Sequence, residues 1–289
     1  MDTKLQKYLD TQITEITEAR FHSLPATAVG GGCINRSYRL KSNSINYFVK
    51  LNSIDKAEMF TAEYEALGEL QATCTIRVPK PLLVGHFDAQ SFLILEDLEF
   101  ASSKSNWSLM GKQLAQLHRH SNEQHGWHRD NTIGLTQQKN QLTKNWADFF
   151  CSQRLAPQLE HSQQQGYSIA NTEVVLENTQ RILGNHTPEP SLLHGDLWSG
   201  NAGFLTDGTP VIYDPATYYG DRETDIAFTE FFGGFPSSFY QAYQNEWPLE
   251  ATYDQRKDLY NLYHVLNHLN LFGRSYLTQA QTMIRQLIS

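Results

Sequence analysis

Two carboxylates and an amide lie close together in the sequence on either side of a short turn. Asp196 comes first, Asn201 follows it, and Asp214 comes at the end of the segment. A carboxylate on a loop can take the proton of a hydroxyl group, so Asp196 is the expected catalytic base. An amide oxygen and a carboxylate suit Mg²⁺, which makes Asn201 and Asp214 the expected metal ligands. Together these groups indicate phosphoryl transfer, which depends on positioning and charge neutralisation.

The residues around this triplet support that interpretation. The run from His194 to Asn201, HGDLWSGN, has the Asp-to-Asn interval of the protein-kinase catalytic loop. Two apolar stretches, 202–205 and 211–213, flank a turn at 206–209 and predict a hairpin. A lone Asp or Asn in a turn would be expected to cap backbone groups. The three residues together favour a catalytic site.

The first third of the chain contains groups that could hold a nucleotide. Lys50 closes an apolar strand pattern, and Glu63 lies on a predicted helix that follows. A lysine–glutamate pair of this kind orients the lysine on the α- and β-phosphates of ATP. Taken alone, each residue would be interpreted as solvated. Three other glutamates share the helix, so the pattern by itself does not single out Glu63.

Two further segments could contact a nucleotide. Gly30, Gly31 and Gly32 lie between predicted strands, where glycines let backbone N–H groups approach phosphate. They match neither of the common glycine-rich phosphate motifs, and a plain hairpin turn is the alternative. A buried strand pattern turns polar at Glu96. The backbone groups of Glu96 and Leu98 either pair with an adenine edge or belong to an ordinary linker.

Hydrophobic periodicity divides the chain into a strand-rich first third and a helix-rich remainder. Strands are expected at 27–29, 37–40, 45–51, 82–87 and 91–95, and helices at 2–20, 56–71, 106–121, 141–165, 170–184, 222–232, 236–246 and 254–285. This order predicts an α+β fold with two lobes. The expected bounds are 1–98 for an N-terminal nucleotide-binding lobe and 99–289 for a C-terminal catalytic and substrate lobe.

The composition argues against several classes of partner and compartment. With 31 acidic and 23 basic residues the formal charge is −8, so neither nucleic acid nor an anionic membrane is an expected partner. Cys33, Cys74 and Cys151 are too few and too far apart for a disulfide framework or a zinc site. The N-terminus has no signal-peptide pattern, and the longest apolar runs have the length of strands. A cytoplasmic protein is expected, and both a monomer and a dimer are compatible with the sequence.

Other kinds of site have less support. His118, His120, His125 and His128 lie close together, but helix residues two apart do not face each other, and no cysteine is near. Ser199 lacks the G-x-S-x-G surroundings of a hydrolase nucleophile. A set of aromatic residues could form a stacking platform, although core packing is the commoner use: Tyr218, Tyr219, Phe228, Phe231 and Phe232.

With these motifs the chain resembles the fructosamine (ketosamine) kinases, a branch of the protein-kinase-like fold shared with aminoglycoside and choline phosphotransferases. The resemblance covers nearly the whole chain. The segments that carry it are GGGCINRSYRL (30–40), FVKLN (48–52), FTAEYEAL (60–67), LHGDLWSGN (193–201), YDPATYYGDRETDIA (213–227) and NHLNLFGRSYL (267–277). HGD-x-x-x-x-N marks the broader class, whereas Trp198 and DPA-x-YYGDRE-x-DIA are more specific to the fructosamine kinases.

The resemblance implies a small N-terminal lobe with an antiparallel sheet and a larger, mainly helical C-terminal lobe. ATP and Mg²⁺ are the implied cofactors. Asp196 would be the base that receives the sugar-hydroxyl proton, and Asn201 and Asp214 would hold Mg²⁺. Lys50 and Glu63 would be the strand lysine and its helix partner, which strengthens the choice of Glu63.

The resemblance also implies a substrate. The family phosphorylates the 3-hydroxyl of a sugar attached to an amine, and the product then releases the amine, which amounts to deglycation and protein repair. Trp198 and His268 would line the ketosamine pocket, with Tyr219 at its wall. Asp225 would brace the catalytic loop through backbone hydrogen bonds.

One difference from protein kinases restricts the kinds of phosphoryl acceptor that are expected. Pro215-Ala216 follows Asp214 in place of Phe-Gly, and no Ala-Pro-Glu comes after it, so the activation segment is missing. Recognition of a peptide is therefore not expected, but a glycated lysine fits because only its sugar need enter the pocket. The alternatives are a phosphotransferase for an aminoglycoside or amino alcohol, and a non-catalytic nucleotide-binding module. The presence of all four polar groups, Lys50, Asp196, Asn201 and Asp214, argues against the module.

Overall fold

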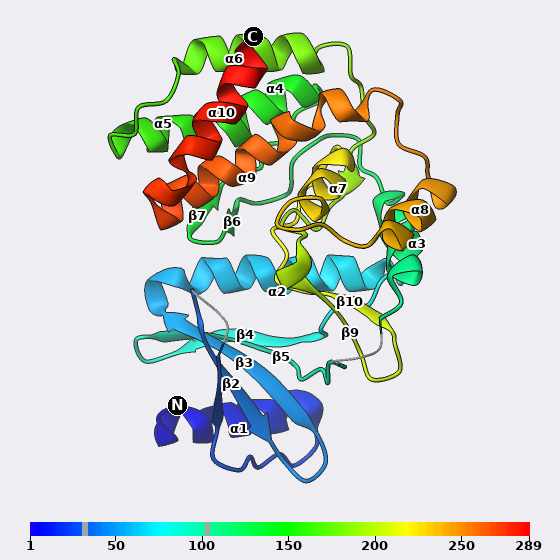
Figure 1. Cartoon of the computed structure of the whole chain (residues 1–289). Coiled ribbons are helices and arrows are strands. Elements are labelled where there is room, and N and C mark those ends of the chain that lie inside the picture. Colours follow the sequence, from blue (N-terminus) through cyan, green and yellow to red (C-terminus); the bar gives the residue numbers. More distant parts are fainter. Residues whose placement is uncertain (31–33, 102–104) are drawn as a thin grey trace.

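The computed structural model describes residues 1–30, 34–101 and 105–289 and shows an α+β protein with two lobes (Figure 1). The smaller lobe is built on a five-stranded antiparallel sheet of order β1-β2-β3-β5-β4. Its strands are β1 (Thr27–Val29), β2 (Arg36–Lys41), β3 (Asn46–Ser53), β4 (Pro81–Phe87) and β5 (Gln90–Glu96), and its helices are α1 (Thr3–Thr17) and α2 (Ala57–Ala72). The expected fold class is confirmed.

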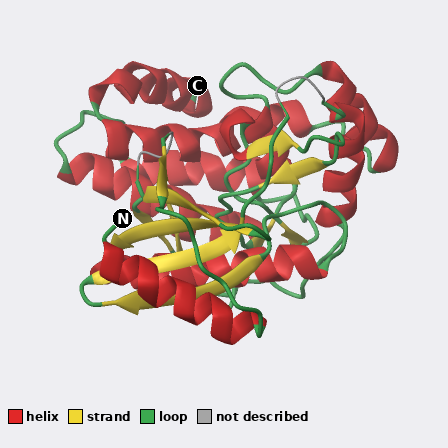
Figure 2. Cartoon of the chain, turned by 90° about the horizontal axis from the view of Figure 1, so that it is seen from below, coloured by secondary structure: helices red, strands yellow, loops and turns green. Residues whose placement is uncertain are grey.

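The interior strand β5, between β3 and β4, is buried on both faces, and its alternating side chains belong to two cores. Phe92 and Ile94 pack with the apolar face of α1, which lies across the sheet (Figure 2). Leu93 and Leu95 point the other way and pack with α2. Complete burial of side chains of this size stabilises the fold by about 1.5–3 kcal/mol each.

The core beneath α2 continues into the larger lobe without a break. Leu93, Leu95 and the buried face of α2 belong to the same cluster as the helices that follow residue 106. In Figure 1, α2 lies between the sheet and those helices. The lobe boundary at residue 98 stays a prediction, because the shared core does not divide there.

The larger lobe is mainly helical. Its helices are α3 (Trp107–His118), α4 (Trp146–Phe150), α5 (Ala156–Gln164), α6 (Thr172–Leu183), α7 (Glu223–Thr229), α8 (Ser237–Glu246), α9 (Lys257–Phe272) and α10 (Leu277–Ile288). Its strand pairs are β6 (Asn131–Ile133) with β7 (Thr136–Gln138), β8 (Ser191–Leu192) with β11 (Tyr219–Gly220), and β9 (Ala202–Phe204) with β10 (Pro210–Ile212). Of the helices described, none is both long and apolar enough to cross a bilayer.

Two of the predicted helices are wrong in extent. The helix expected at 254–285 is two helices, because Gly273 takes a φ of 87° and ends α9. The helix expected from residue 141 begins only at Trp146, where the Asn145 side chain caps it by accepting the Asp148 N–H at 2.9 Å. The β6–β7 hairpin was not predicted, because strands of three residues are too short to show a period.

Candidate active site

The loop after β8 and the β9–β10 hairpin bring the polar triplet together. Asn201 ends a single helical turn, and its Nδ2 donates to the Asp196 backbone oxygen at 2.8 Å and to Asp196 Oδ2 at 3.0 Å. The Tyr213 N–H donates to the Asn201 carbonyl at 3.0 Å. This bond brings Asp214, the next residue, back beside the loop. Asp214 has a φ of 58°, a left-handed conformation that Asp tolerates better than most residues.

Lys50 on β3 joins the two lobes at this point. Its Nζ lies 2.5 Å from Glu63 Oε1 and 2.6 Å from Asp214 Oδ1. Burial alone would lower the pKa of Lys50, but the charges of Asp214 and Glu63 outweigh it and raise the pKa above its ordinary value. The ammonium is therefore charged at physiological pH and is held between the carboxylates of Glu63 and Asp214.

The structure also separates Glu63 from the other glutamates of α2. Glu58 and Glu65 both pair with Arg129, which lies on the loop before β6. Glu69 accepts from Trp127 and Tyr219 instead. Of the four glutamates of α2, Glu63 is the one that bonds to a residue of β3, and its contact with Lys50 agrees with the choice made from the sequence.

The charges around Asp196 and Asp214 favour a bound cation. Burial and then the charge of Asp214 raise the pKa of Asp196 well above its ordinary value. Asn201 uses its Nδ2 for Asp196, and its Oδ1 accepts no hydrogen bond among the described residues. The Asp214 side chain is 50% exposed. Two oxygen ligands are thus available where a divalent cation would relieve the repulsion between carboxylates.

Asp225 on α7 holds the catalytic loop. Its Oδ2 accepts the His194 N–H at 2.7 Å, and its Oδ1 accepts the Gly195 N–H at 2.8 Å. Gly195 has a φ of 82°, and a Cβ there would lie 2.1 Å from the Ala216 oxygen. Only glycine fits this crossing of two loops. The brace implied by the resemblance is present as a contact.

A chain of hydrogen bonds leads outward from Asp225. Arg222 Nη1 donates to the Tyr243 oxygen at 3.0 Å, which directs the Tyr243 hydroxyl proton toward His118 Nδ1 at 2.8 Å. His118 Nε2 then donates to Asp225 Oδ2 at 3.2 Å. Burial lowers the pKa of His118, which agrees with the neutral ring that this order of donors requires.

A cavity of about 700 Å³ lies between the lobes and contains this site. It is lined by residues of both lobes: Val29, Gly30, Ile34, Asn35, Ser37, Arg39, Phe48, Lys50, Met59, Ala62, Glu63, Pro79, Leu95, Glu96, Asp97, Leu98, Phe100, Asn131, Thr132, Ile133, Gly134, Asp196, Trp198, Gly200, Asn201, Tyr213, Asp214, Pro215, Ala216, Asn267, His268, Leu271 and Phe272. Its volume suits a nucleotide together with a small acceptor.

The expected nucleotide contacts lie on one side of this cavity. Gly30 lines it, whereas Gly31 and Gly32 fall outside the described residues. Glu96 and Leu98 also line it. The Glu96 N–H is already bonded to the Lys80 carbonyl at 2.9 Å. The Leu98 N–H has no hydrogen-bond partner within the described part of the chain, so it is available to an adenine edge.

The expected substrate residues divide into two groups. Trp198 and His268 line the cavity. Tyr219 does not line it: its hydroxyl donates to Glu69 at 2.7 Å, and its backbone pairs with Leu192. The expectation that Tyr219 forms a wall of the pocket is therefore wrong. Its pairing with β8 places the ring toward Glu69 of α2.

An aromatic group that the sequence indicated only in part, through Phe232 but not through Phe272 or Tyr276, lies beside Trp198 and His268. The Phe232 ring lies 5.7 Å from the Trp198 ring and 5.1 Å from the His268 ring, between centroids. Phe272 and Tyr276 lie 5.5 and 5.1 Å from His268. The cluster of aromatic residues after 217 was noticed in the sequence, but nothing there separated Phe232 from core residues such as Phe228.

Three of the four histidines that cluster in the sequence have separate side-chain partners in the structure, and the fourth, His120, is exposed. His118 bonds to Asp225, and the His125 ring lies 5.0 Å from the Trp146 ring. His128 bonds to Glu65 at 2.8 Å.

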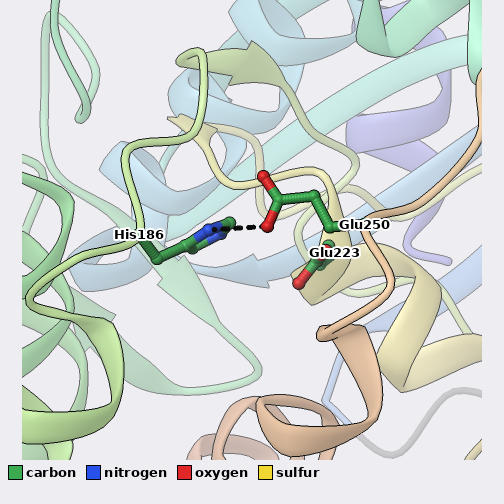
Figure 3. Close-up of side chains that lie close together, drawn as sticks. All are labelled: His186, Glu223 and Glu250. Atoms are coloured by element: carbon green, nitrogen blue, oxygen red, sulfur yellow. Dashed lines mark ion pairs between the residues drawn. The ribbon is translucent and has the colours of Figure 1, made fainter.

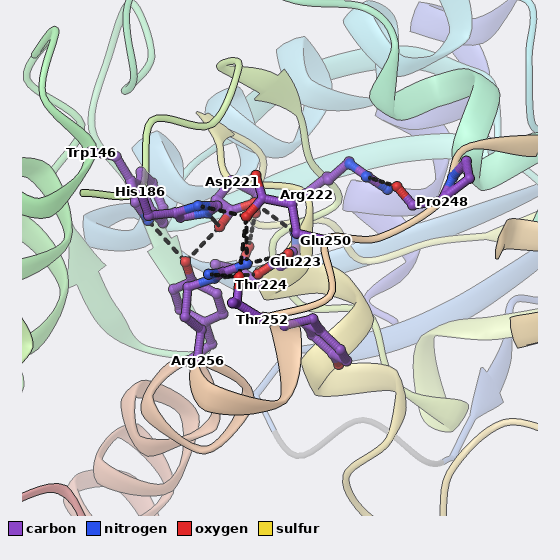
Figure 4. Close-up of polar contacts among 12 residues, drawn as sticks. Trp146, His186, Asp221, Arg222, Glu223, Thr224, Pro248, Glu250, Thr252 and Arg256 are labelled. Carbon is purple, nitrogen blue, oxygen red and sulfur yellow. Dashed lines mark hydrogen bonds and ion pairs between the residues drawn. The ribbon is translucent and has the colours of Figure 1, made fainter. Parts of the chain in front are cut away.

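A second group of titratable side chains lies outside the cavity (Figure 3). His186, Glu223 and Glu250 offer atoms within 4.8 Å of one another. Both imidazole nitrogens already face carboxylates, Asp221 at 2.7 Å and Glu250 at 3.3 Å. Arg256 donates to both Glu223 oxygens at 2.7 and 2.8 Å (Figure 4). The guanidinium takes the place of a metal ion, and the network anchors the start of α7.

Comparison with known proteins identifies the family. The family model described as fructosamine kinase matches residues 5–289. The chain belongs to the fructosamine kinase family. As a member of this kinase family it uses ATP as the phosphoryl donor.

Relatives with named activities match this chain over most of their length. A protein from Synechocystis sp., named a probable ketoamine kinase, is 48% identical over 279 residues, which cover 96% of this chain and 95% of the relative. The chloroplastic protein-ribulosamine 3-kinase of Arabidopsis thaliana is 38% identical over 280 residues, covering 95% of this chain and 82% of the relative.

Solved structures agree with this assignment. A candidate fructosamine-3-kinase from Haemophilus somnus 129PT superimposes with a TM-score of 0.92 at 32% identity, covering 97% of each chain. An aminoglycoside phosphotransferase bound to AMP-PNP and hygromycin B gives a TM-score of 0.67 at 16% identity, covering 99% of this chain and 98% of the other. The second likeness supports the kinase-like fold alone.

Proposed function

We propose that this protein transfers the γ-phosphoryl group of Mg·ATP to the 3-hydroxyl of a sugar joined to an amine, as in fructosamine, ribulosamine or a glycated lysine. Its relatives are named ketoamine kinases and protein-ribulosamine 3-kinases. The observation that carries the proposal is the contact of Lys50 with Asp214, next to Asn201 and Asp196, in a cavity that Trp198 also lines.

Each residue of the site has a separate role in the proposed reaction. Lys50, oriented by Glu63, binds the phosphates. Asn201 and Asp214 would hold Mg²⁺ through their oxygen atoms, and the bound ion would supply neutralisation of charge on the phosphates. Asp196 accepts the proton of the sugar 3-hydroxyl as that oxygen bonds to the γ-phosphorus. The bond from this phosphorus to the β–γ bridging oxygen breaks, and ADP leaves.

The nucleotide in this proposal lies beside Gly30, which lines the cavity. The available Leu98 N–H and the Glu96 carbonyl would meet the adenine edge. The sugar lies on the other side of Asp196, toward Trp198 and His268. The phosphorylated adduct then releases its amine, so the cellular outcome is deglycation.

A phosphotransferase for aminoglycosides or choline is the second candidate. It is favoured only by the shared fold, at 16% identity to the aminoglycoside enzyme. The specific DPA-x-YYGDRE-x-DIA segment and the family match favour a ketosamine.

A single panel separates these functions. The protein is incubated with Mg·ATP and, in turn, fructosamine, ribulosamine, choline and kanamycin, and ADP release is measured. Turnover of the two ketosamines is expected. Turnover of choline or kanamycin alone would reject the ketosamine function, and no ADP with any acceptor would favour a non-catalytic module.

A further inference from the structure

Five rings form a continuous aromatic surface at the substrate end of the cavity. They are Trp198, Phe232, His268, Phe272 and Tyr276, and each lies within 6 Å of its neighbour between ring centroids. Trp198, His268 and Phe272 line the cavity itself. The surface is therefore continuous with the proposed sugar site and leads away from it.

Two of these rings are exposed in a way that packing does not explain. Phe232 is 41% exposed and Phe272 is 52% exposed, although both are large and apolar. Phe232 also has a φ of 47°, a left-handed conformation that is unusual for a bulky residue. A strained backbone that presents an exposed ring beside a binding site points to a role in binding.

Most acidic side chains that line the cavity are already paired with basic residues, so few carboxylates are left to bind a substrate ammonium. Among its described lining residues, Glu63 and Asp214 are bound to Lys50. Glu96 pairs with Arg77, and Asp97 pairs with Arg39 at 2.7 Å. The remaining carboxylate of the described lining is Asp196, which the reaction itself needs.

The histidine at the centre of the surface suits a cation as well. His268 Nδ1 lies 2.7 Å from the His264 carbonyl, so this nitrogen carries the proton. In the neutral ring Nε2 is then an acceptor, able to receive an N–H or O–H of a ligand. Burial lowers the pKa of His268, so the ring stays neutral and does not repel a cation.

We propose that this aromatic surface binds the amine-bearing part of the ketosamine, with the protonated amine against ring faces and the amine's substituent lying over Phe232 and Phe272. Cation–π contact takes the place of an ion pair, since the ring faces are negative. The surface would favour amines with an extended substituent, such as the methylene chain of a glycated lysine. This inference rests on the proposed ketosamine kinase function.

The test compares three acceptors with the wild-type protein and ring-deleted variants. The acceptors are the fructosyl derivative of Nα-acetyl-lysine, fructosyl-methylamine, and a neutral 1-O-hexyl fructose ether. The variants are Phe232→Leu, Phe272→Leu and, as a matched exposed apolar residue of the other lobe, Ile45→Ala. Phe232→Asn is added because Asn tolerates a left-handed φ, so it removes the ring while keeping the turn.

The expected result is a rise of at least fivefold in KM for fructosyl-lysine in each ring variant, with kcat and the KM for ATP within twofold of wild type. The rise in KM for the neutral ether is at most half as large, because the ether has no ammonium group that makes a cation–π contact with the rings. Ile45→Ala leaves all values within twofold. Wild type that turns over no ketosamine rejects the proposed function. Wild type that is active, with fructosyl-lysine KM values unchanged in folded variants, rejects only the aromatic site.

Discussion

The carboxylate of Asp225 accepts the backbone N–H of Gly195 at 2.8 Å, one residue before the proposed base Asp196. Burial alone would raise the pKa of Asp225, but bonds from His118 and the loop N–H groups lower it below its ordinary value. The carboxylate is thus ionised and satisfied, although it is buried. The position of Asp196 depends on a residue that need not touch the substrate.

Replacement of Asp225 should therefore damage both activity and stability. Asp225→Asn presents an amide where the His194 and Gly195 N–H groups need acceptors, and one buried donor is left unpaired. We expect kcat to fall more than tenfold and the free energy of unfolding to fall by about 2–4 kcal/mol. Steady-state kinetics and urea unfolding measure the two. Glu246→Gln, at the half-buried end of α8 in the same lobe, is the control, and equal kcat in both variants would contradict the bracing role of Asp225.

Asp196 is expected to affect chemistry without affecting nucleotide binding. Asp196→Asn keeps the shape of the loop but removes the proton acceptor, so kcat should fall by a factor of about 10²–10⁴. Calorimetric titration with AMP-PNP and Mg²⁺ should give a Kd close to that of wild type. A tenfold or larger loss of nucleotide affinity would contradict the assignment of Asp196 to the acceptor side.

Lys50 should be needed for stability as well as for binding ATP. Lys50→Met leaves the buried carboxylate of Glu63 without its partner, and we expect a loss of about 3 kcal/mol in the free energy of unfolding. The double variant Lys50→Met with Glu63→Gln removes that unpaired charge and should recover part of the loss. Denaturant unfolding of both variants checks this. If the double variant is less stable than Lys50→Met, the charge argument is wrong.

His264 should make the protein less stable in acid. Its ring stacks on Phe228 at 3.6 Å, and burial lowers its pKa to about 3. The unfolded chain binds a proton at this histidine below about pH 6.5, whereas the folded protein does not. Stability is therefore lost as the pH falls from about 6.5 toward 3, by at most about 1.4 kcal/mol per pH unit.

The contribution of His264 can be isolated by difference. His264→Phe keeps a ring on Phe228 and removes the titration, so its stability should fall less steeply between pH 6.5 and 4. The measurement is chemical unfolding at each pH, compared with wild type. If the free energy of unfolding falls equally steeply with pH in the two proteins, another buried histidine, such as His118, is responsible for the loss of stability in acid.

Much of the fold could be predicted from local patterns. The five sheet strands, the helix at 57–72 and the β9–β10 hairpin follow from period and turn residues within ten or so neighbours. The failures also have local causes. Gly273 ends a helix that the apolar spacing predicts to continue, and the three-residue strands β6 and β7 are too short to detect from their period.

The proposed catalytic triplet was visible in the sequence because its members lie within one loop and one hairpin, where the chain path allows little choice. Tertiary structure decided the contacts that span the chain. The Lys50–Asp214 pair joins residues 164 positions apart, and Tyr219 turned toward Glu69 and away from the cavity. The aromatic surface combines segments near 198, 232 and 270. Such groupings depend on how whole elements pack, because residues far apart in sequence meet only when the shared core sets the positions of the helices and strands that carry them.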